Sequence, residues 1–363
     1  MELLSVTMND GVMPRSEIEG KDNSSEDKSN YKVVLTGDMV YNSMRMWQGA
    51  NGISPCDGIV SPAYTVLMPK IPISNGYFAA FFKSPNLINE FRKNSQGMTS
   101  DTWNLKYPQI ETIKVCIPAL LEQNRIADML GTLERRIAKQ AQLVENLKKY
   151  KRGAFEMVFS PKVRLIPKSK RKDWQHYKLS DFTTRVTRKN RGQSDIPLTI
   201  SAQYGLIDQR DFFSKTIASA DMSGYYLLRS GEYAYNRSTS NDYPFGSIKR
   251  LELYPMGAVS TLYLCFRVKD DIVLSDLAKW YFESSQWHRG VNEICAEGAR
   301  NHGLLNVPTD GFFNTVHTLP SDPEEQLAIA SYLSLFQARL DSAQAVFEKL
   351  LRIRSGLMQR LFI

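Results

Sequence analysis

Two stretches of about 39 residues, 121–159 and 324–362, carry apolar residues at steps of three, four and seven among polar ones. This spacing is typical of a helix that packs against one partner helix through a narrow apolar seam, as in a coiled coil. At a rise of about 1.5 Å per residue, each predicted helix extends over roughly 58 Å and needs a packing partner to be stable. The predicted seam consists of Ile126, Leu130, Leu133, Ile137, Leu147, Ile329, Leu333, Phe336, Leu340 and Leu350.

The second stretch is a copy of the first. A shift of 203 residues aligns Gln123 with Gln326 and Phe159 with Phe362 without a gap. Such internal repetition indicates a duplicated structural unit. Because both copies carry matching seams within one chain, we predict that the two helices pack antiparallel on each other. A coiled coil between two chains is the alternative.

The segments before each helix also repeat. A shift of 194 residues places the strand-like run 4–7 on 198–201, and a shift of 199 places 58–64 on 257–263. Aromatic residues at helical spacing in 76–91 predict two short helices divided at Ser84-Pro85, and 277–291 repeats this part. The fold class is therefore α+β, with two similar mixed α/β domains and two long antiparallel helices.

The repeat defines five segments. We expect the first domain to be incomplete at its start, because residues 174–196 precede the first matched strand of the second domain and almost nothing precedes Leu3. We expect the first domain to lack about two dozen residues, either because the true start lies upstream or because the gene is a trimmed copy. The predicted segments are a first domain at 1–118, a helix at 119–160, a basic linker at 161–173, a second domain at 174–320 and a helix at 321–363.

Charge points to an anionic partner. The net charge is +8 and the isoelectric point is about 9.1. Basic residues gather at 148–152 and continue through the linker to Arg191. Those in the last helical turn oppose the helix dipole, whereas those beyond it are either phosphate contacts or a solvated linker.

Composition excludes several other classes of protein. No apolar run is long enough for a membrane span, and no secretion signal is present at the N-terminus. The four cysteines form no closely spaced pair, which favours reduced thiols and a cytoplasmic location.

The sequence predicts no catalytic or metal site. Nucleotide-binding, metalloprotease and esterase motifs are absent, and the four histidines have no Cys, Asp or Glu at metal-ligand spacing. Residues 241–245, Asn-Asp-Tyr-Pro-Phe, faintly resemble the Asn/Asp-Pro-Pro-Tyr/Phe loop of amino-methyltransferases, but the first proline is missing and no glycine-rich cofactor loop follows a strand. We interpret this likeness as chance.

Two similar domains joined by long helices favour a protein that reads two separated sites. Arginine and asparagine side chains can bind guanine and adenine edges bidentately. Asn42 and Asn236 recur at matching places, so holding a turn is an equally good explanation for them. Residues that do not recur are better candidates for specificity. The candidate DNA contacts are Asn42, Arg45, Trp47, Arg188, Lys189, Asn236, Arg237, Asn241 and Arg300.

The chain resembles the specificity subunit of Type I restriction–modification systems. The resemblance rests on Pro118 with 122–127 (Glu-Gln-Asn-Arg-Ile-Ala) and on Pro320 with 325–330 (Glu-Gln-Leu-Ala-Ile-Ala), each followed by a long helix with a Gly and Phe near its end. Residues 174–181 also resemble the family's opening of a recognition domain. The first domain lacks this opening and so departs from the family pattern.

The resemblance implies a function. It implies two target recognition domains that each read half of a bipartite double-stranded DNA site, with the paired helices as a ruler between the halves. It implies a non-catalytic subunit without a cofactor of its own. Two modification subunits would bind S-adenosylmethionine and methylate adenine, and restriction subunits would use ATP and Mg for translocation and DNA cleavage as the endonuclease. The alternatives are a two-headed protein-binding scaffold without DNA specificity and a self-contained methyltransferase.

Overall fold

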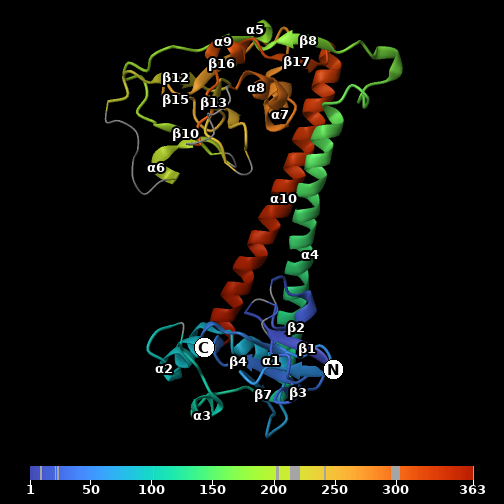
Figure 1. The fold of residues 1–363 in the computed structure, drawn as a ribbon, viewed down its shortest axis with the longest axis vertical. Coiled ribbons are helices and arrows are strands. Elements are labelled where there is room, and N and C mark those ends of the chain that lie inside the picture. Colours follow the sequence, from blue (N-terminus) through green and yellow to red (C-terminus); the bar gives the residue numbers. More distant parts are fainter. Residues whose placement is uncertain are drawn as a thin grey trace. The chain divides into compact units, whose positions relative to one another are not determined.

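The computed structural model describes residues 1–8, 10–20, 22, 24–100, 102–201, 204–212, 221–240, 243–295 and 303–362, and it confirms the predicted α+β fold class (Figure 1). The chain forms two compact units. Unit 1 contains Met1–Val144 and Ala343–Ile363, and unit 2 contains Glu145–Ser342. Each unit therefore includes part of both long helices.

Unit 1 has two small sheets, with the strand orders β2-β1-β6-β3 and β5-β4-β7 in its described part. Within the first sheet only β1 and β6 run parallel. The elements are β1 (Glu2–Val6), β2 (Val12–Pro14), β3 (Lys32–Val34), β4 (Met39–Asn42), β5 (Asn51–Ile53), β6 (Gly58–Val60), β7 (Tyr64–Leu67), α1 (Asn75–Phe81), α2 (Pro85–Asn94) and α3 (Tyr107–Ile110).

Unit 2 contains counterparts of these strands in the same chain order. Its four-stranded sheet has the strand order β14-β13-β16-β9. Its elements are β8 (Gln175–Lys178), α5 (Leu179–Phe182), β9 (Thr183–Arg185), β10 (Leu198–Ser201), β11 (Gly205–Asp208), α6 (Gln209–Phe212), β12 (Tyr226–Arg229), β13 (Tyr233–Asn236), β14 (Ser247–Arg250), β15 (Met256–Val259), β16 (Leu264–Val268), α7 (Ser275–Glu283), α8 (His288–Ile294), α9 (Thr309–Phe313) and β17 (Val316–Leu319).

Two local features of unit 1 follow from its sequence, and one of them is the predicted boundary at Ser84-Pro85. The turn between β3 and β4 is closed by a 3.0 Å hydrogen bond from the backbone N–H of Asp38 to the carbonyl of Leu35. Ser84 ends the link between α1 and α2, and its hydroxyl caps α2 by accepting from the N–H of Leu87. Pro85 stands at the first helical position, where its missing N–H costs nothing.

The two long helices are α4 (Leu120–Val158) and α10 (Pro323–Leu361). In unit 1 they run antiparallel, because Gln140 of α4 donates to the carbonyl of Ala343 at 2.8 Å and Glu134 lies 3.5 Å from Arg354. In unit 2 the end of α4 likewise shares a core with the beginning of α10. These contacts confirm the antiparallel pair within one chain.

All ten predicted seam residues are buried or half-buried. Seven are buried, namely Leu130, Ile137, Leu147, Ile329, Leu333, Leu340 and Leu350, and three are half-buried, namely Ile126, Leu133 and Phe336. Polar residues cover most of the remaining circumference, as expected for helices that bury one stripe.

Each unit closes its core with the end of the helix that comes from the other half of the repeat. Phe159, just after α4, packs on Tyr281 in unit 2 with ring centroids 5.4 Å apart. Phe362, just after α10, packs on Phe81 in unit 1 at the same distance. The duplicated phenylalanine of the sequence repeat therefore has the same structural role twice.

The duplicated glutamine of the repeat holds the start of each long helix. The amide of Gln123 accepts from the N–H of Ser74 at 3.0 Å and donates to the carbonyl of Pro118 at 2.9 Å. Gln326 accepts from the N–H of Leu274 at 2.7 Å and donates to the carbonyl of Pro320 at 2.9 Å. Both glutamines are almost fully buried, so these bonds replace water and fix the helix start against its own domain.

The units differ in one respect. In unit 2 the elements β8, α5 and β9 precede the strand that corresponds to β1, and among the described residues of unit 1 they have no counterpart. No described helix is both long enough and apolar enough to cross a membrane.

Candidate nucleic-acid interface

Matching asparagines end the central strands β4 and β13. The side-chain oxygen of Asn42 accepts from the backbone N–H of Met44, and that of Asn236 accepts from the N–H of Ser238, both at 3.0 Å. The two asparagines form the same local turn, which explains why they recur. The structure thus supports the turn-holding alternative for both residues.

The turn after β4 belongs to a pair of loops that we call the reading loops of unit 1, residues 42–48 and 95–104. Gln96 and Asn104 exchange two backbone hydrogen bonds across the base of the second loop, at 3.0 and 2.9 Å. The N–H of Leu105 then donates to the carbonyl of Ser43 in the first loop at 2.8 Å. The central strand and the segment after α2 therefore present their loops together.

Unit 2 joins the corresponding loops in the same way. Leu305 donates to the carbonyl of Arg237 at 3.0 Å, and the N–H of Thr239 donates to the carbonyl of Gly303 at 2.7 Å. We call residues 236–240 and 303–305 the described part of the reading loops of unit 2. Asn241 and Arg300, two predicted contacts, lie outside the described residues.

Aromatic rings fix the reading loops of unit 1. The indoles of Trp47 and Trp103 meet edge to face with centroids 5.1 Å apart, and Trp47 donates its ring N–H to the carbonyl of Met44 at 3.1 Å. The guanidinium of Arg92 lies 5.7 Å from the Trp47 ring centre, in cation–π geometry. Trp47 thus acts as a packing residue between the loops and leaves part of its surface exposed.

Arg45 stands next to this aromatic cluster with an exposed side chain. Within the described ranges, no group forms a hydrogen bond or ion pair with its guanidinium. An exposed guanidinium without a described partner has the geometry and charge to bind a phosphate or a guanine edge. Arg45 therefore has side-chain donors available to a ligand.

Arg92 and Trp103 were not predicted from the sequence. The signal for Trp103 was present in the repeat, since a shift of 200 residues carries the predicted loop at Arg300 onto residue 100, in the second reading loop of unit 1. Applying the repeat to this loop would have brought Trp103 among the candidates.

Three predicted contacts of unit 2 have structural partners. Arg188 pairs with the buried Glu232 at 2.7 Å, and Arg237 donates to two backbone carbonyls at 3.0 and 3.3 Å. Lys189 donates to the carbonyl of Gly224 at 2.8 Å and lies 4.6 Å from the ring centre of Tyr226. These cations hold the domain together, so their positive charge is less available to a ligand.

The basic linker is largely paired with the start of α10. Lys170 lies 2.7 Å from Glu324 and Lys172 lies 3.0 Å from Asp322. Arg164 binds both carboxylate oxygens of Glu325 through its Nε and Nη2 atoms, the latter at 2.6 Å. Sequence analysis left two explanations for the basic residues of the linker, phosphate contacts or a solvated linker. These ion pairs give Arg164, Lys170 and Lys172 a third role within the protein.

The basic end of α4 lines a cavity of about 490 Å³ in unit 2. Lys148, Lys151 and Arg152 form one wall, and Lys249 and Trp287 belong to the other. Burial lowers the pKa of Lys151, whose ammonium lies 5.4 Å from the ring centre of Phe155. The lining combines cations and aromatic rings with the carboxylates of Glu156 and Glu283, so its positive charge is partly neutralised.

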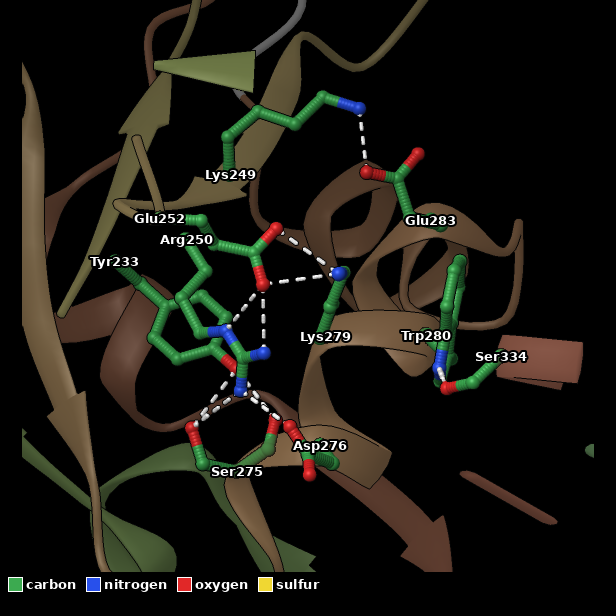
Figure 2. A network of polar contacts seen from close by, with 10 residues as sticks. All are labelled: Tyr233, Lys249, Arg250, Glu252, Ser275, Asp276, Lys279, Trp280, Glu283 and Ser334. Atoms are coloured by element: carbon green, nitrogen blue, oxygen red, sulfur yellow. Dashed lines mark hydrogen bonds and ion pairs between the residues drawn. The ribbon is translucent and has the colours of Figure 1, made fainter. Parts of the chain in front are cut away.

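Figure 2 shows a network of polar contacts that links β14 and Glu252, which follows it, to α7. Arg250 bridges Glu252 at 2.7 Å and Asp276 at 2.8 Å, and Lys279 binds Glu252 at 2.9 Å. The phenol of Tyr233 donates to the carbonyl of Ser275 at 2.6 Å. Lys249, next along β14, pairs with Glu283 at the end of α7. The network holds Lys249 on a rigid strand beside the cavity.

No group of three or more metal-ligating side chains occurs among the residues that the structure describes. His317 is buried between the hydroxyls of Tyr281 and Thr315, at 2.9 and 2.8 Å, and burial lowers its pKa to about 4.

The sequence and the fold both have known relatives. Residues 7–149 match the family model described as Type I restriction modification DNA specificity domain. The fold is similar to that of an HsdS subunit from Thermoanaerobacter tengcongensis, with 16% identity, 93% of this chain and 83% of that chain covered, and a TM-score of 0.50.

Two further solved structures have a similar fold. A Type-I restriction-modification system S subunit from M. genitalium shares 13% identity over 92% of this chain and 84% of that chain, with a TM-score of 0.57. A chain from a structure concerned with complex assembly and conformational transition of the type I R-M system shares 16% identity over 93% and 84%, with a TM-score of 0.53. At these identities the likeness concerns the fold.

Proposed function

We propose that this chain, whose residues 7–149 match the model of the Type I restriction modification DNA specificity domain, belongs to that family and recognises a bipartite double-stranded DNA site for a methyltransferase and endonuclease complex. In this proposal each unit reads one half of the site, and partner subunits carry out adenine methylation and DNA cleavage. The chain itself supplies recognition and no catalysis.

The observation that carries the proposal is the repetition of the reading loops. In both units the loop after the central strand is hydrogen-bonded to the loop after the second short helix, through Ser43 and Leu105 in unit 1 and through Arg237 and Leu305 in unit 2. The frame is thus the same, whereas the side chains on it differ, as is required of two readers of different sequences.

The long helices support the bipartite part of the proposal. Each is a single element of 39 residues whose two ends belong to different units. We propose that the pair fixes the number of base pairs between the half-sites, and that modification subunits dock on its exposed sides.

The proposal is tested by co-expressing the chain with a modification subunit from the same genome and mapping N6-methyladenine. We expect methylation at one two-part motif and none when this chain is omitted. An active methyltransferase complex that methylates no two-part motif would contradict the proposal.

A salt titration separates this function from a protein-binding scaffold. If about six phosphates are contacted, the DNA affinity should fall by about a thousandfold or more between 50 and 200 mM salt. A scaffold without DNA specificity would show no steep salt dependence and no preference for DNA that contains the methylated motif.

A further inference from the structure

Met98 is the most exposed large apolar side chain in the described part of the chain, with an exposed fraction of 99%. It lies in the second reading loop of unit 1, whose base is closed by the backbone bridge between Gln96 and Asn104. The first reading loop exposes a further methionine, Met44, at 43%. A lone exposed apolar side chain is ordinary on a protein surface, and what sets Met98 apart is the loop that carries it.

The backbone on both sides of Met98 is fixed. The N–H of Thr102 donates to the carbonyl of Thr99 at 3.0 Å, and the hydroxyl of Thr102 accepts from the N–H of Thr99 at 3.2 Å. Gly97 has a φ of +148°, and a Cβ at this position would lie 2.6 Å from the carbonyl oxygen of Thr102. Only glycine permits this close approach, so the loop is a tight closed turn that holds Met98 in solvent.

Exposed cations lie around the base of this loop. Arg92 belongs to α2, which leads into the loop, and its guanidinium lies 5.7 Å from the ring centre of Trp47. Lys106 follows Leu105, whose N–H joins the second loop to the first, and Arg45 lies on the first loop. Cations at these places suit DNA phosphates, whereas an uncharged apolar side chain between them suits the stacked bases.

We propose that Met98 is an apolar wedge that enters the base stack of DNA and separates two neighbouring base pairs in the half-site that unit 1 reads. This inference rests on the proposed function. Methionine is one of the apolar side chains with which DNA-binding proteins unstack a base step. Adenine methylation requires the target base to leave the stack, and a step that is already separated lowers the cost of that movement.

The test uses the full chain in complex with its modification subunit and duplexes that contain the methylated motif. Each adenine is replaced in turn by 2-aminopurine and each cytosine by pyrrolocytosine, two analogues whose fluorescence rises when they are unstacked. Because every base pair contains an adenine or a cytosine, the set reports on every base step.

The wild-type complex should raise the fluorescence by about twofold at a position next to the wedge, in addition to any rise at the methylated adenine. Met98→Gln, which keeps the length of the side chain and makes its end polar, should remove most of the rise at that position. Met98→Leu should keep it, because leucine is also an apolar wedge.

The affinity for the motif should follow the fluorescence. Met98→Gln should weaken binding by about tenfold, since an apolar side chain no longer leaves water on binding. It should leave the unfolding temperature of the chain unchanged, because the side chain packs against nothing in the folded protein.

Met68→Gln is the matched control in the same unit. Met68 is 83% exposed and follows β7, whose last residue, Leu67, pairs with Met39 at the end of β4 opposite to Asn42. It therefore lies at the far end of the sheet from the reading loops. Its substitution should change neither the fluorescence of any duplex nor the affinity.

The possible failures can be told apart. A wild-type complex without preference for the motif would contradict the proposed function, and the wedge would fall with it. A wild-type complex that prefers the motif, with the same fluorescence rises in Met98→Gln, would overturn the wedge alone. Loss of the modification subunit from the Met98→Gln complex in size-exclusion chromatography would also overturn it, because Met98 would then contact protein and not DNA.

Discussion

Glu122 and Glu325 occupy equivalent places at the start of the two long helices, yet one is exposed and the other is fully buried. The next residues, Gln123 and Gln326, are buried in both units and make the same two contacts. The repeat therefore preserved the attachment of each helix to its domain. What differs is the cover over the helix start, which unit 2 takes from its linker and from β8–α5–β9.

This difference explains two features of the sequence. The linker is basic because Asp322, Glu324 and Glu325 lie beneath it. The start of α4 is apolar at Leu120 and Leu121, where no such linker lies. The start of α10 is therefore charged and covered by the linker, whereas the equivalent start of α4 is apolar and has no such cover among the described residues.

The largest effect is expected at the buried carboxylate. Arg164→Met leaves Glu325 charged and buried, which should destabilise unit 2 by about 3 kcal/mol, at the low end of the range for broken buried pairs because Arg164 keeps some exposure. Hydrogen exchange followed by mass spectrometry measures the opening free energy of each unit separately. Glu122→Ala, the matched change in unit 1, should leave the opening free energy of that unit almost unchanged. An equal loss of opening free energy in the two units would contradict the difference between Glu122 and Glu325.

Acid should also separate the units, since all four histidines of the sequence lie in the segment that forms unit 2. Burial lowers the pKa of His317 to about 4, below the 6.5 of an unfolded chain. The unfolded state therefore binds more protons between these values, and stability is lost as the pH falls below 6.5.

From pH 7 to pH 5 this histidine should cost unit 2 about 2 kcal/mol. The lowered pKa of His288, which is also due to burial, has the same sign. Hydrogen exchange at the two pH values should show the loss in unit 2, a smaller loss in the His317→Gln variant and little change in unit 1. An equal loss in both units would contradict this assignment.

The starts of the two long helices should respond alike. Gln123→Ala and Gln326→Ala each remove two buried hydrogen bonds, so each should cost its own unit about 1.5 kcal/mol. Gln326 also donates to the carbonyl of Ile272 at 3.0 Å, so its loss should be somewhat larger. If only one substitution had an effect, the structural equivalence of the two helix starts would be wrong.

The smallest effect concerns the reading loops. Arg45→Ala should weaken binding to DNA containing the methylated motif by about tenfold and binding to unrelated DNA much less, because a base-reading arginine carries sequence information. Arg136→Ala on α4 removes the same charge from an exposed position and serves as the control. Equal effects of Arg45→Ala on both DNAs would assign Arg45 to phosphate contact instead.

The architecture could be predicted from the sequence because it depends on repetition and periodicity. The seam from Ile126 to Leu147 and its copy predicted two long helices, which the structure has at Leu120–Val158 and Pro323–Leu361. The Ser84-Pro85 boundary between α1 and α2 was equally readable, since proline cannot continue a preceding helix.

The site was less predictable, because its residues depend on contacts between loops that are far apart in the sequence. Arg188 and Arg237 have the composition of DNA contacts, but Glu232 and the carbonyls of Leu262 and Val307 bind them. Trp47 was among the predicted contacts, whereas its packing partner Trp103, which was not predicted, lies 56 positions further along the chain. The segment boundaries at 118, 160, 173 and 320 and the DNA contacts themselves stay predictions.

Shortening both long helices at matched positions decides whether two readers share one spacer. Deleting 134–140 from α4 and 343–349 from α10 removes one paired heptad, or about 10 Å of helix, which corresponds to about three base pairs at 3.4 Å each. The N6-methyladenine map of the variant complex should show both half-sites unchanged and the gap between them shorter by about three base pairs. A variant complex that methylates the original motif with its original gap would show that the helices do not set the spacing.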